Sequence, residues 1–212
     1  MVECEVPRIK ICGVTSLGDA HVIVDAGADA LGLIYASSVR GVDADVATDI
    51  VRRFSNDLWC VGVFRHQTDQ EIVRIVERDK LPVVQLHDTA TENLLDALAT
   101  RDVKVIRAVT ADTVDLTERE KCDVVAVLID GTSPGSGVAQ DWSRLHSLHF
   151  DVPTMIAGGL DAQNVGDVIA ATSPWGVDVA SGVEQEHGVK DPAKVVNFVF
   201  RARAALSLEG ER

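Results

Sequence analysis

The sequence predicts a single-domain α/β protein, a (β/α)8 TIM barrel in which eight parallel strands alternate with helices. Three observations support this fold. The chain of 212 residues suits one such barrel, short apolar runs alternate with amphipathic segments from end to end, and no shift in composition marks a second domain. A doubly wound open sheet is the alternative, but it normally needs fewer strands, and no GxGxxG motif follows the first apolar run.

The predicted strands are short runs rich in Val and Ile. They are apolar almost without interruption, which is typical of parallel strands buried on both faces. They span residues 8–12, 30–35, 59–64, 82–86, 103–109, 123–129, 153–157 and 176–180.

Between the strands, apolar residues recur at intervals of three and four, as they do along one face of a helix. Asp43 is a predicted N-cap, and Thr68 with Glu71 forms a capping-box pattern. The segments after residues 110 and 140 predict only a turn or two of helix, and the tail after Leu206 is expected to fray. The main predicted helices span residues 16–28, 43–54, 68–79, 91–102, 161–172 and 191–206.

The chain is strongly acidic, which argues against some classes of partner. Its net charge of −13 repels nucleic acid and anionic membrane surfaces, so neither is an expected partner. The acidic residues are mostly aspartate, a composition that keeps a protein hydrated at high salt, and we therefore hypothesise a salt-adapted (halophilic) host. The sequence contains no run of eighteen apolar residues, the length needed to span a bilayer. Its first ten residues do not resemble a signal peptide.

The four cysteines, at positions 4, 12, 60 and 122, form no CxxC pair and no zinc-like spacing. We interpret them as reduced thiols of a cytoplasmic protein. Cys60 and Cys122 are expected to be core or strand-edge residues, because free cysteine usually behaves as a small apolar side chain. Cys12 stands apart because it ends the first predicted strand.

Barrels of this kind hold their chemistry where strands end and βα loops begin. The plausible reactive groups of this sequence all fall at such strand ends, whereas random placement would scatter them along the chain. They are Cys12, Arg40, Arg65, His66, His87, Asp130, the glycine pair 158–159 and the Ser-Gly pair 181–182.

Three glycine-bearing turns at that face predict a phosphate site. Glycines let backbone N–H groups approach an anion, and barrels often hold phosphate in the loops after strands seven and eight. No Walker motif is present, so a nucleoside triphosphate is not expected. The predicted phosphate-binding residues are Gly135, Ser136, Gly137, Gly158, Gly159, Ser181 and Gly182.

Cys12 and Asp130 form a candidate acid–base pair, because they end strands one and six on opposite sides of the ring. A helix N-terminus can lower a thiol pKa, and burial can raise the pKa of a carboxyl group. The structural alternative is that Cys12 plugs the barrel and Asp130 caps a turn. His87 could bind substrate, shuttle protons or be structural, and Lys10 is taken as a supporting charge.

Six motifs occur in a fixed order along the chain: KICGVT, ADALGLIYASSVRGV, VGVF with VQLH, LIDGTSPGSGVAQDW, AGGLDAQNV and VDVASGVE. Together, over residues 8–205, they resemble phosphoribosylanthranilate isomerase of tryptophan biosynthesis. The resemblance implies an Amadori rearrangement of N-(5-phosphoribosyl)anthranilate to 1-(2-carboxyphenylamino)-1-deoxyribulose 5-phosphate. It implies general acid–base catalysis without a metal or cofactor.

The resemblance also implies roles for the residues that match the motifs. Cys12 would be the general base that takes the sugar C2′ proton, and Asp130 would be the general acid that protonates the ring oxygen. Arg40 would meet the anthranilate carboxylate, and Asp178 would contact the substrate. Gly158, Gly159, Ser181 and Gly182 would hold the phosphate.

The chain departs from the family pattern at Gly41, His66, Asp88 and Pro134, and ASSVR replaces a lysine-rich stretch. Two alternatives stay open: another phosphate-binding barrel enzyme, similar to thiamine-phosphate synthase, or a catalytically silent barrel that acts as a binding partner. A second isomerisation, on a histidine-pathway substrate, normally relies on aspartates at strands one and six, whereas strand one here ends in Cys12. The sequence leaves the oligomeric state open.

Overall fold

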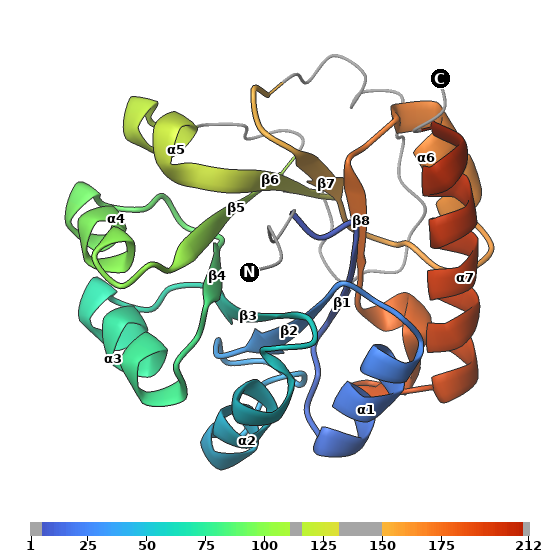
Figure 1. Cartoon of the computed structure of the whole chain (residues 1–212), viewed down its shortest axis with the longest axis horizontal. Helices are drawn as coiled ribbons and strands as arrows, with labels where there is room; N and C mark the ends of the chain where they lie inside the picture. Colours follow the sequence, from blue (N-terminus) through green and yellow to red (C-terminus); the bar gives the residue numbers. More distant parts are fainter. Residues whose placement is uncertain (1–5, 111–115, 132–149, 210–212) are drawn as a thin grey trace.

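A closed barrel of eight parallel strands forms the centre of the computed structural model, which describes residues 6–110, 116–131 and 150–209 (Figure 1). Each strand pairs with its neighbours in chain order, and β8 closes the ring against β1, with Lys10 beside Asp178. This confirms the predicted fold class. The strands are β1 (Ile9–Cys12), β2 (Ala30–Ile34), β3 (Trp59–Phe64), β4 (Val83–Leu86), β5 (Lys104–Thr110), β6 (Val124–Asp130), β7 (Thr154–Ile156) and β8 (Gly176–Val179).

Helices cover the outside of the barrel (Figure 1). The predicted caps are present: the Asp43 side chain accepts the Asp45 N–H, and Thr68 and Glu71 form a reciprocal capping box. Within the described part of the chain, no helix has the length and apolar character that crossing a membrane requires. The helices are α1 (Leu17–Asp25), α2 (Ala44–Phe54), α3 (Asp69–Asp79), α4 (Glu92–Ala99), α5 (Glu118–Asp123), α6 (Val165–Thr172) and α7 (Pro192–Glu209).

Alternate residues of each strand face opposite sides of the sheet, and this alternation decides which side chains can form a site. In β1, Ile9 and Ile11 pack outward in the large cluster beneath the helices, whereas Cys12 belongs to the cluster inside the barrel. Lys10 faces the same side as Cys12 because the two are separated by two positions. Leu128 of β6 also lies in the inner cluster, so Asp130, two residues later, points into the barrel mouth.

Two helix boundaries differ from the prediction. The helix expected from Asp161 begins at Val165, because the Asp161 carboxylate accepts the N–H groups of Gln163 and Asn164 and stabilises a turn instead. Helix α7 continues to Glu209, past the expected fraying point at Leu206. Two features accompany the longer helix: the Leu206 side chain is buried, and the Ser207 hydroxyl donates to the Arg203 carbonyl.

A short hairpin after β8 was not predicted. The 3₁₀ turn Ser181–Val183 leads into β9 (Glu184–Glu186), which pairs antiparallel with β10 (Val189–Lys190). The hairpin is too short for an apolar pattern to reveal it. Its position at the carboxyl end of β8 places it beside the barrel mouth.

The described cysteines, at positions 12, 60 and 122, are free thiols. Cys60 is buried in β3, as expected. The expectation for Cys122 was wrong, because this residue is exposed on α5, which ends before β6 begins. The apolar run after it starts at Val124 and leaves Cys122 outside the core.

Candidate active site

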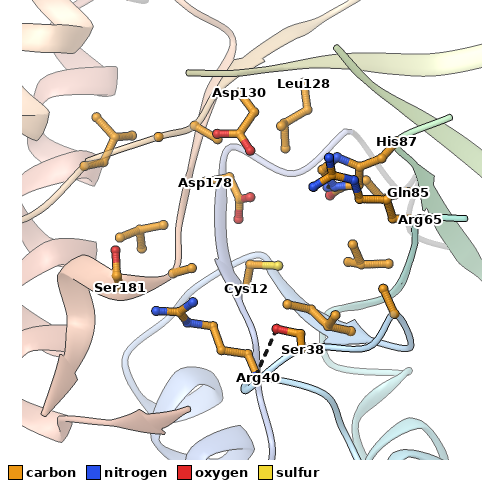
Figure 2. Close-up of a pocket in the computed structure, with 18 of the residues that line it drawn as sticks. Cys12, Ser38, Arg40, Arg65, Gln85, His87, Leu128, Asp130, Asp178 and Ser181 are labelled. Atoms are coloured by element: carbon orange, nitrogen blue, oxygen red, sulfur yellow. Dashed lines mark hydrogen bonds between the residues drawn. The ribbon is translucent and has the colours of Figure 1, made fainter. Parts of the chain in front are cut away.

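A pocket opens at the carboxyl ends of the strands, the face predicted to hold the reactive groups (Figure 2). Its volume is about 270 Å³, close to the lower limit for small-molecule sites. The barrel therefore brings together side chains from both halves of the chain. The predicted site residues that line the pocket are Cys12, Arg40, His87, Asp130, Gly158, Gly159, Asp178 and Ser181.

Cys12 ends β1 and lines the pocket wall. Its sulfur lies against Gly32 of β2, where a Cβ atom would come within 2.7 Å of Cys12 Sγ and 3.2 Å of Lys10 Nζ. The thiol and the Lys10 ammonium thus occupy the space that a side chain at position 32 would fill. Burial raises the pKa of the Cys12 thiol, and the charge of Lys10 opposes that rise. Lys10 therefore favours the thiolate form, the form that can accept a proton.

Lys10 is fully buried and bound to Asp178. Its Nζ donates to Asp178 Oδ1 at 3.0 Å. Burial alone would disfavour the ammonium, but Asp178 and Cys12 raise the pKa of Lys10 above its ordinary value. Asp178, predicted as a substrate contact, lines the pocket and also anchors the lysine beside the thiol.

Asp130 ends β6 and points into the same pocket as Cys12 (Figure 2). Burial, with the nearby Asp178 charge, raises the pKa of Asp130 to about 6, although the Gly131 N–H and Lys10 oppose the rise. A carboxyl group with a pKa near neutrality is partly protonated at working pH. It can therefore donate a proton to a bound substrate.

Arg40, in the loop after β2, is held by an acidic residue that is not among the predicted site residues. Its Nε and Nη2 donate to the two carboxylate oxygens of Glu184 at 2.8 and 2.9 Å. Nη2 also lies 3.0 Å from His187 Nδ1. These contacts use Nε and Nη2 of a group with five N–H donors, so other donors are available for an anion.

His87 follows β4 and lines the pocket together with Gln85. Burial lowers the pKa of His87 to about 4, as do the charges of Lys10, Arg65 and Arg107. The imidazole is therefore neutral at neutral pH and acts as a hydrogen-bonding group rather than a proton carrier. Gln85 Nε2 lies 3.0 Å from His87 Nε2, while the buried Gln85 Oε1 has no partner among the described residues.

The turns after β7 and β8, where the sequence predicts a phosphate site, lie in contact with each other. Gly158 has a φ of +98°, and a Cβ atom there would lie 2.7 Å from the Gly131 N atom, beside Asp130. A Cβ atom on Gly182 would lie 1.9 Å from the Leu160 carbonyl oxygen, so only glycine lets these two turns meet. Gly182 itself is not among the lining residues. Gly135, Ser136 and Gly137 lie outside the described residues.

Two of the departures from the family pattern contact each other. The His66 backbone N–H donates to the Asp88 carboxylate, and His66 Nδ1 lies 3.3 Å from Asp88 Oδ1. His66 has a φ of 71°, in the left-handed region where asparagine is also favoured. The pair joins the loops after β3 and β4, so the two substitutions support one loop contact together.

Three residues around the pocket were missed from the sequence: Gln85, Glu184 and Lys190. Gln85 could have been found, because it lies two positions before His87 on the inward face of β4. Glu184 could also have been found, because it is the last residue of the motif VDVASGVE. Lys190 carries no sequence signal, because its hairpin was not predicted.

Comparisons with known proteins agree with one another. Residues 9–201 match the family described as N-(5'phosphoribosyl)anthranilate (PRA) isomerase. The chain is 38% identical over 202 residues to N-(5'-phosphoribosyl)anthranilate isomerase of Desulforudis audaxviator, covering 93% of this chain and 98% of that protein. The crystal structure of phosphoribosyl anthranilate isomerase from Thermus thermophilus matches with a TM-score of 0.79 at 33% identity, covering 93% of this chain and 98% of that one. A phosphoribosyl anthranilate isomerase in complex with reduced 1-(O-carboxyphenylamino)-1-deoxyribulose 5-phosphate matches with a TM-score of 0.74 at 30% identity, covering 94% and 100%.

Proposed function

This chain belongs to the N-(5'-phosphoribosyl)anthranilate isomerase family, and we propose that Cys12 and Asp130 perform the acid–base steps of its reaction. The protein is an isomerase of tryptophan biosynthesis. It catalyses the Amadori rearrangement of N-(5-phosphoribosyl)anthranilate to 1-(2-carboxyphenylamino)-1-deoxyribulose 5-phosphate.

The chemistry needs one acid and one base on opposite sides of the sugar. Asp130 donates a proton to the ring oxygen, the C1′–O bond breaks, and a protonated imine forms between C1′ and the anthranilate nitrogen. Cys12 then takes the proton from C2′, which gives an enolamine. Loss of the proton from the C2′ hydroxyl and gain of one at C1′ complete the ketone, so the reaction is redox-neutral.

The observation that carries this assignment is that Cys12 and Asp130 line one pocket, each in an environment suited to its role. The charge of Lys10 beside the thiol supports the role of Cys12 as the base, and the raised pKa of Asp130 supports its role as the acid. A catalytically silent barrel has no need of either arrangement. Loss of substrate fluorescence on adding the wild-type protein tests the function, and absence of turnover contradicts it.

The remaining roles are proposed from the same pocket. Arg40 receives the anthranilate carboxylate, His87 and Asp178 contact the opened sugar, and the turns after β6, β7 and β8 hold the phosphate. Contact between the turns after β7 and β8, and the five donors of the guanidinium, support these assignments. The phosphosugar is the partner that the site requires.

The pH dependence of kcat/KM is expected to be bell-shaped, with an acidic limb near pH 6. The active pair holds one proton, on Asp130, while Cys12 is ionised. Below about pH 6 the pair holds two protons and has no base, because the pKa of Asp130 is about 6. The alkaline limb lies above the ordinary thiol pKa, because burial raises the pKa of Cys12.

Initial rates between about pH 5 and about pH 10 measure this profile. The limb near pH 6 should be absent from the residual activity of Asp130→Asn, because asparagine does not titrate; the residual rate should instead rise with pH until Cys12 ionises, above the ordinary thiol pKa. A limb near pH 6 that persists in that variant assigns it to another group and contradicts the role given to Asp130.

We further propose that the protein is adapted to high salt, on the strength of its net charge of −13. Added ions screen repulsion among like charges, so the melting temperature should rise from low to multimolar KCl. Thermal melts across that series measure the effect, and constant stability contradicts the proposal.

We also propose a cytoplasmic location, supported by the free thiols at positions 12, 60 and 122. Fractionation of source cells tests it, and recovery outside the cytoplasmic fraction contradicts it.

A further inference from the structure

Lys190, on the hairpin β9–β10, connects three parts of the barrel mouth. Its Nζ donates to the Cys12 carbonyl at 2.6 Å, to the Ala180 carbonyl at 3.1 Å and to Glu184 Oε1 at 3.0 Å. An ammonium group has three N–H donors, and here each meets an acceptor. The side chain is fully buried. The lysine therefore joins the end of β1, the end of β8 and the hairpin.

The connection continues from Glu184 to the substrate-facing arginine. Glu184 Oε1 accepts from both Lys190 Nζ and Arg40 Nε, and its other oxygen accepts from Arg40 Nη2. Although burial acts in the opposite sense, Arg40 and Lys190 hold the pKa of Glu184 below its ordinary value. The carboxylate is thus ionised and orients the guanidinium of Arg40.

The charges of this cluster leave a positive excess at the place proposed for an anion. Arg40 and Lys190 carry two positive charges, and Glu184 carries one negative charge. Burial lowers the pKa of Lys190, and its ion pair with Glu184 opposes that effect. Without Lys190, the bidentate Arg40–Glu184 pair would be neutral as a unit and would attract a carboxylate less strongly.

We propose that Lys190 is a positioning residue of the isomerase, one that fixes the backbone of Cys12 and, through Glu184, the orientation and net charge of the Arg40 site. This inference rests on the proposed function of Cys12 and Arg40. Lys190 does not line the pocket. It acts through the two residues that do.

The pH at which Cys12 ionises is a measurable property of its electrostatic surroundings. Replacing a lysine with a purely structural role would leave that pH unchanged. The charged groups that act on Cys12 are Lys10 from its own strand, Asp178 from β8, Lys190 from the hairpin and Arg40 from the loop after β2. Lys190 is one of the cations that favour the thiolate. Removing its charge should shift the ionisation of Cys12 to higher pH.

The test compares Lys190→Met and Lys190→Gln, which remove the charge, with Lys190→Arg, which keeps it. The control is Lys194→Met, because Lys194 donates to the Glu184 backbone carbonyl rather than to its carboxylate. Two quantities are measured: kcat and KM for the phosphoribosyl anthranilate, and the pH dependence of iodoacetamide alkylation of the Cys12 peptide by mass spectrometry. The second needs no turnover.

Both neutral variants should raise KM, lower kcat/KM on the order of 10²-fold and move the alkylation midpoint of Cys12 to higher pH. Lys190→Arg should keep the midpoint of the wild type, and Lys194→Met should match the wild type in both assays. Unchanged KM and midpoint in a folded neutral variant overturn the inference. Failure of both neutral variants to fold assigns Lys190 to stability alone and also overturns it. Absence of turnover in the wild type contradicts the proposed function instead, while the alkylation assay still tests the inference.

Discussion

Replacing Cys12 with serine is expected to lower kcat by about 10²- to 10⁴-fold while the fold stays intact. A serine hydroxyl keeps the size of the thiol but holds its proton far more tightly, so no base is available to take the C2′ proton near neutral pH. Lys10 keeps its ion pair with Asp178, so the charge around the pocket is preserved. KM should therefore change much less than kcat.

The measurement is the loss of fluorescence of phosphoribosyl anthranilate at high salt, with circular dichroism to establish folding. Cys122→Ser is the matched control, because Cys122 is exposed on α5, away from the pocket. A folded Cys12→Ser variant that turns over at nearly the wild-type rate would remove Cys12 from the role of base.

Replacing Asp130 with asparagine is expected to reduce kcat by a similar factor, about 10²- to 10⁴-fold. The amide is nearly the same shape as the carboxyl group but cannot release a proton to the ring oxygen, so ring opening loses its acid. Asp167→Asn serves as the control, because Asp167 is an exposed carboxylate on α6. A rate close to that of the wild type would assign the acid to another group.

The same substitution should change how stability depends on pH. The pKa of Asp130 rises from the ordinary 3.8 to about 6 on folding, so the folded state binds its proton more tightly than the unfolded state. The stability that this proton contributes is complete below about pH 4 and is lost as pH rises through about 6, a difference of about 3 kcal/mol. The amide introduced by Asp130→Asn cannot titrate, and the variant should therefore gain stability relative to the wild type across that interval.

Urea unfolding of both proteins at several pH values measures this difference. A constant gap between them from about pH 4 to about pH 7 would contradict the raised pKa of Asp130. A wild-type protein that is less stable than its inactive variant is expected where a buried carboxyl group serves catalysis, as proposed for Asp130, rather than packing.

The barrel could be predicted from the sequence because its parallel strands are buried on both faces. That burial produces short continuous apolar runs, and the strands from β1 to β8 occur where those runs predicted them. Helix starts were predictable where a capping residue acts locally, as at Asp43 and Thr68. The start of α6 was not, because the Asp161 side chain favours a turn over the first helical residues.

The positions of the proposed acid and base were also predictable, because the end of a strand can be recognised from the sequence alone. Cys12 and Asp130 each end a strand, and closure of the ring brings both to one pocket. The turn of residues 134–137 lies outside the described residues, so that part of the phosphate prediction stays a prediction.

The order of strands and helices, the face of the barrel with the candidate site, and the candidate acid and base could all be predicted from the sequence. The charges that surround this pair became evident only from the packing of the folded chain. Lys10 meets Asp178 across the β1–β8 closure, Arg40 meets Glu184, and Lys190 meets the Cys12 carbonyl. The physical reason is that strand and helix patterns arise from local spacing and burial, whereas the partner of a buried charge is set by how distant segments pack.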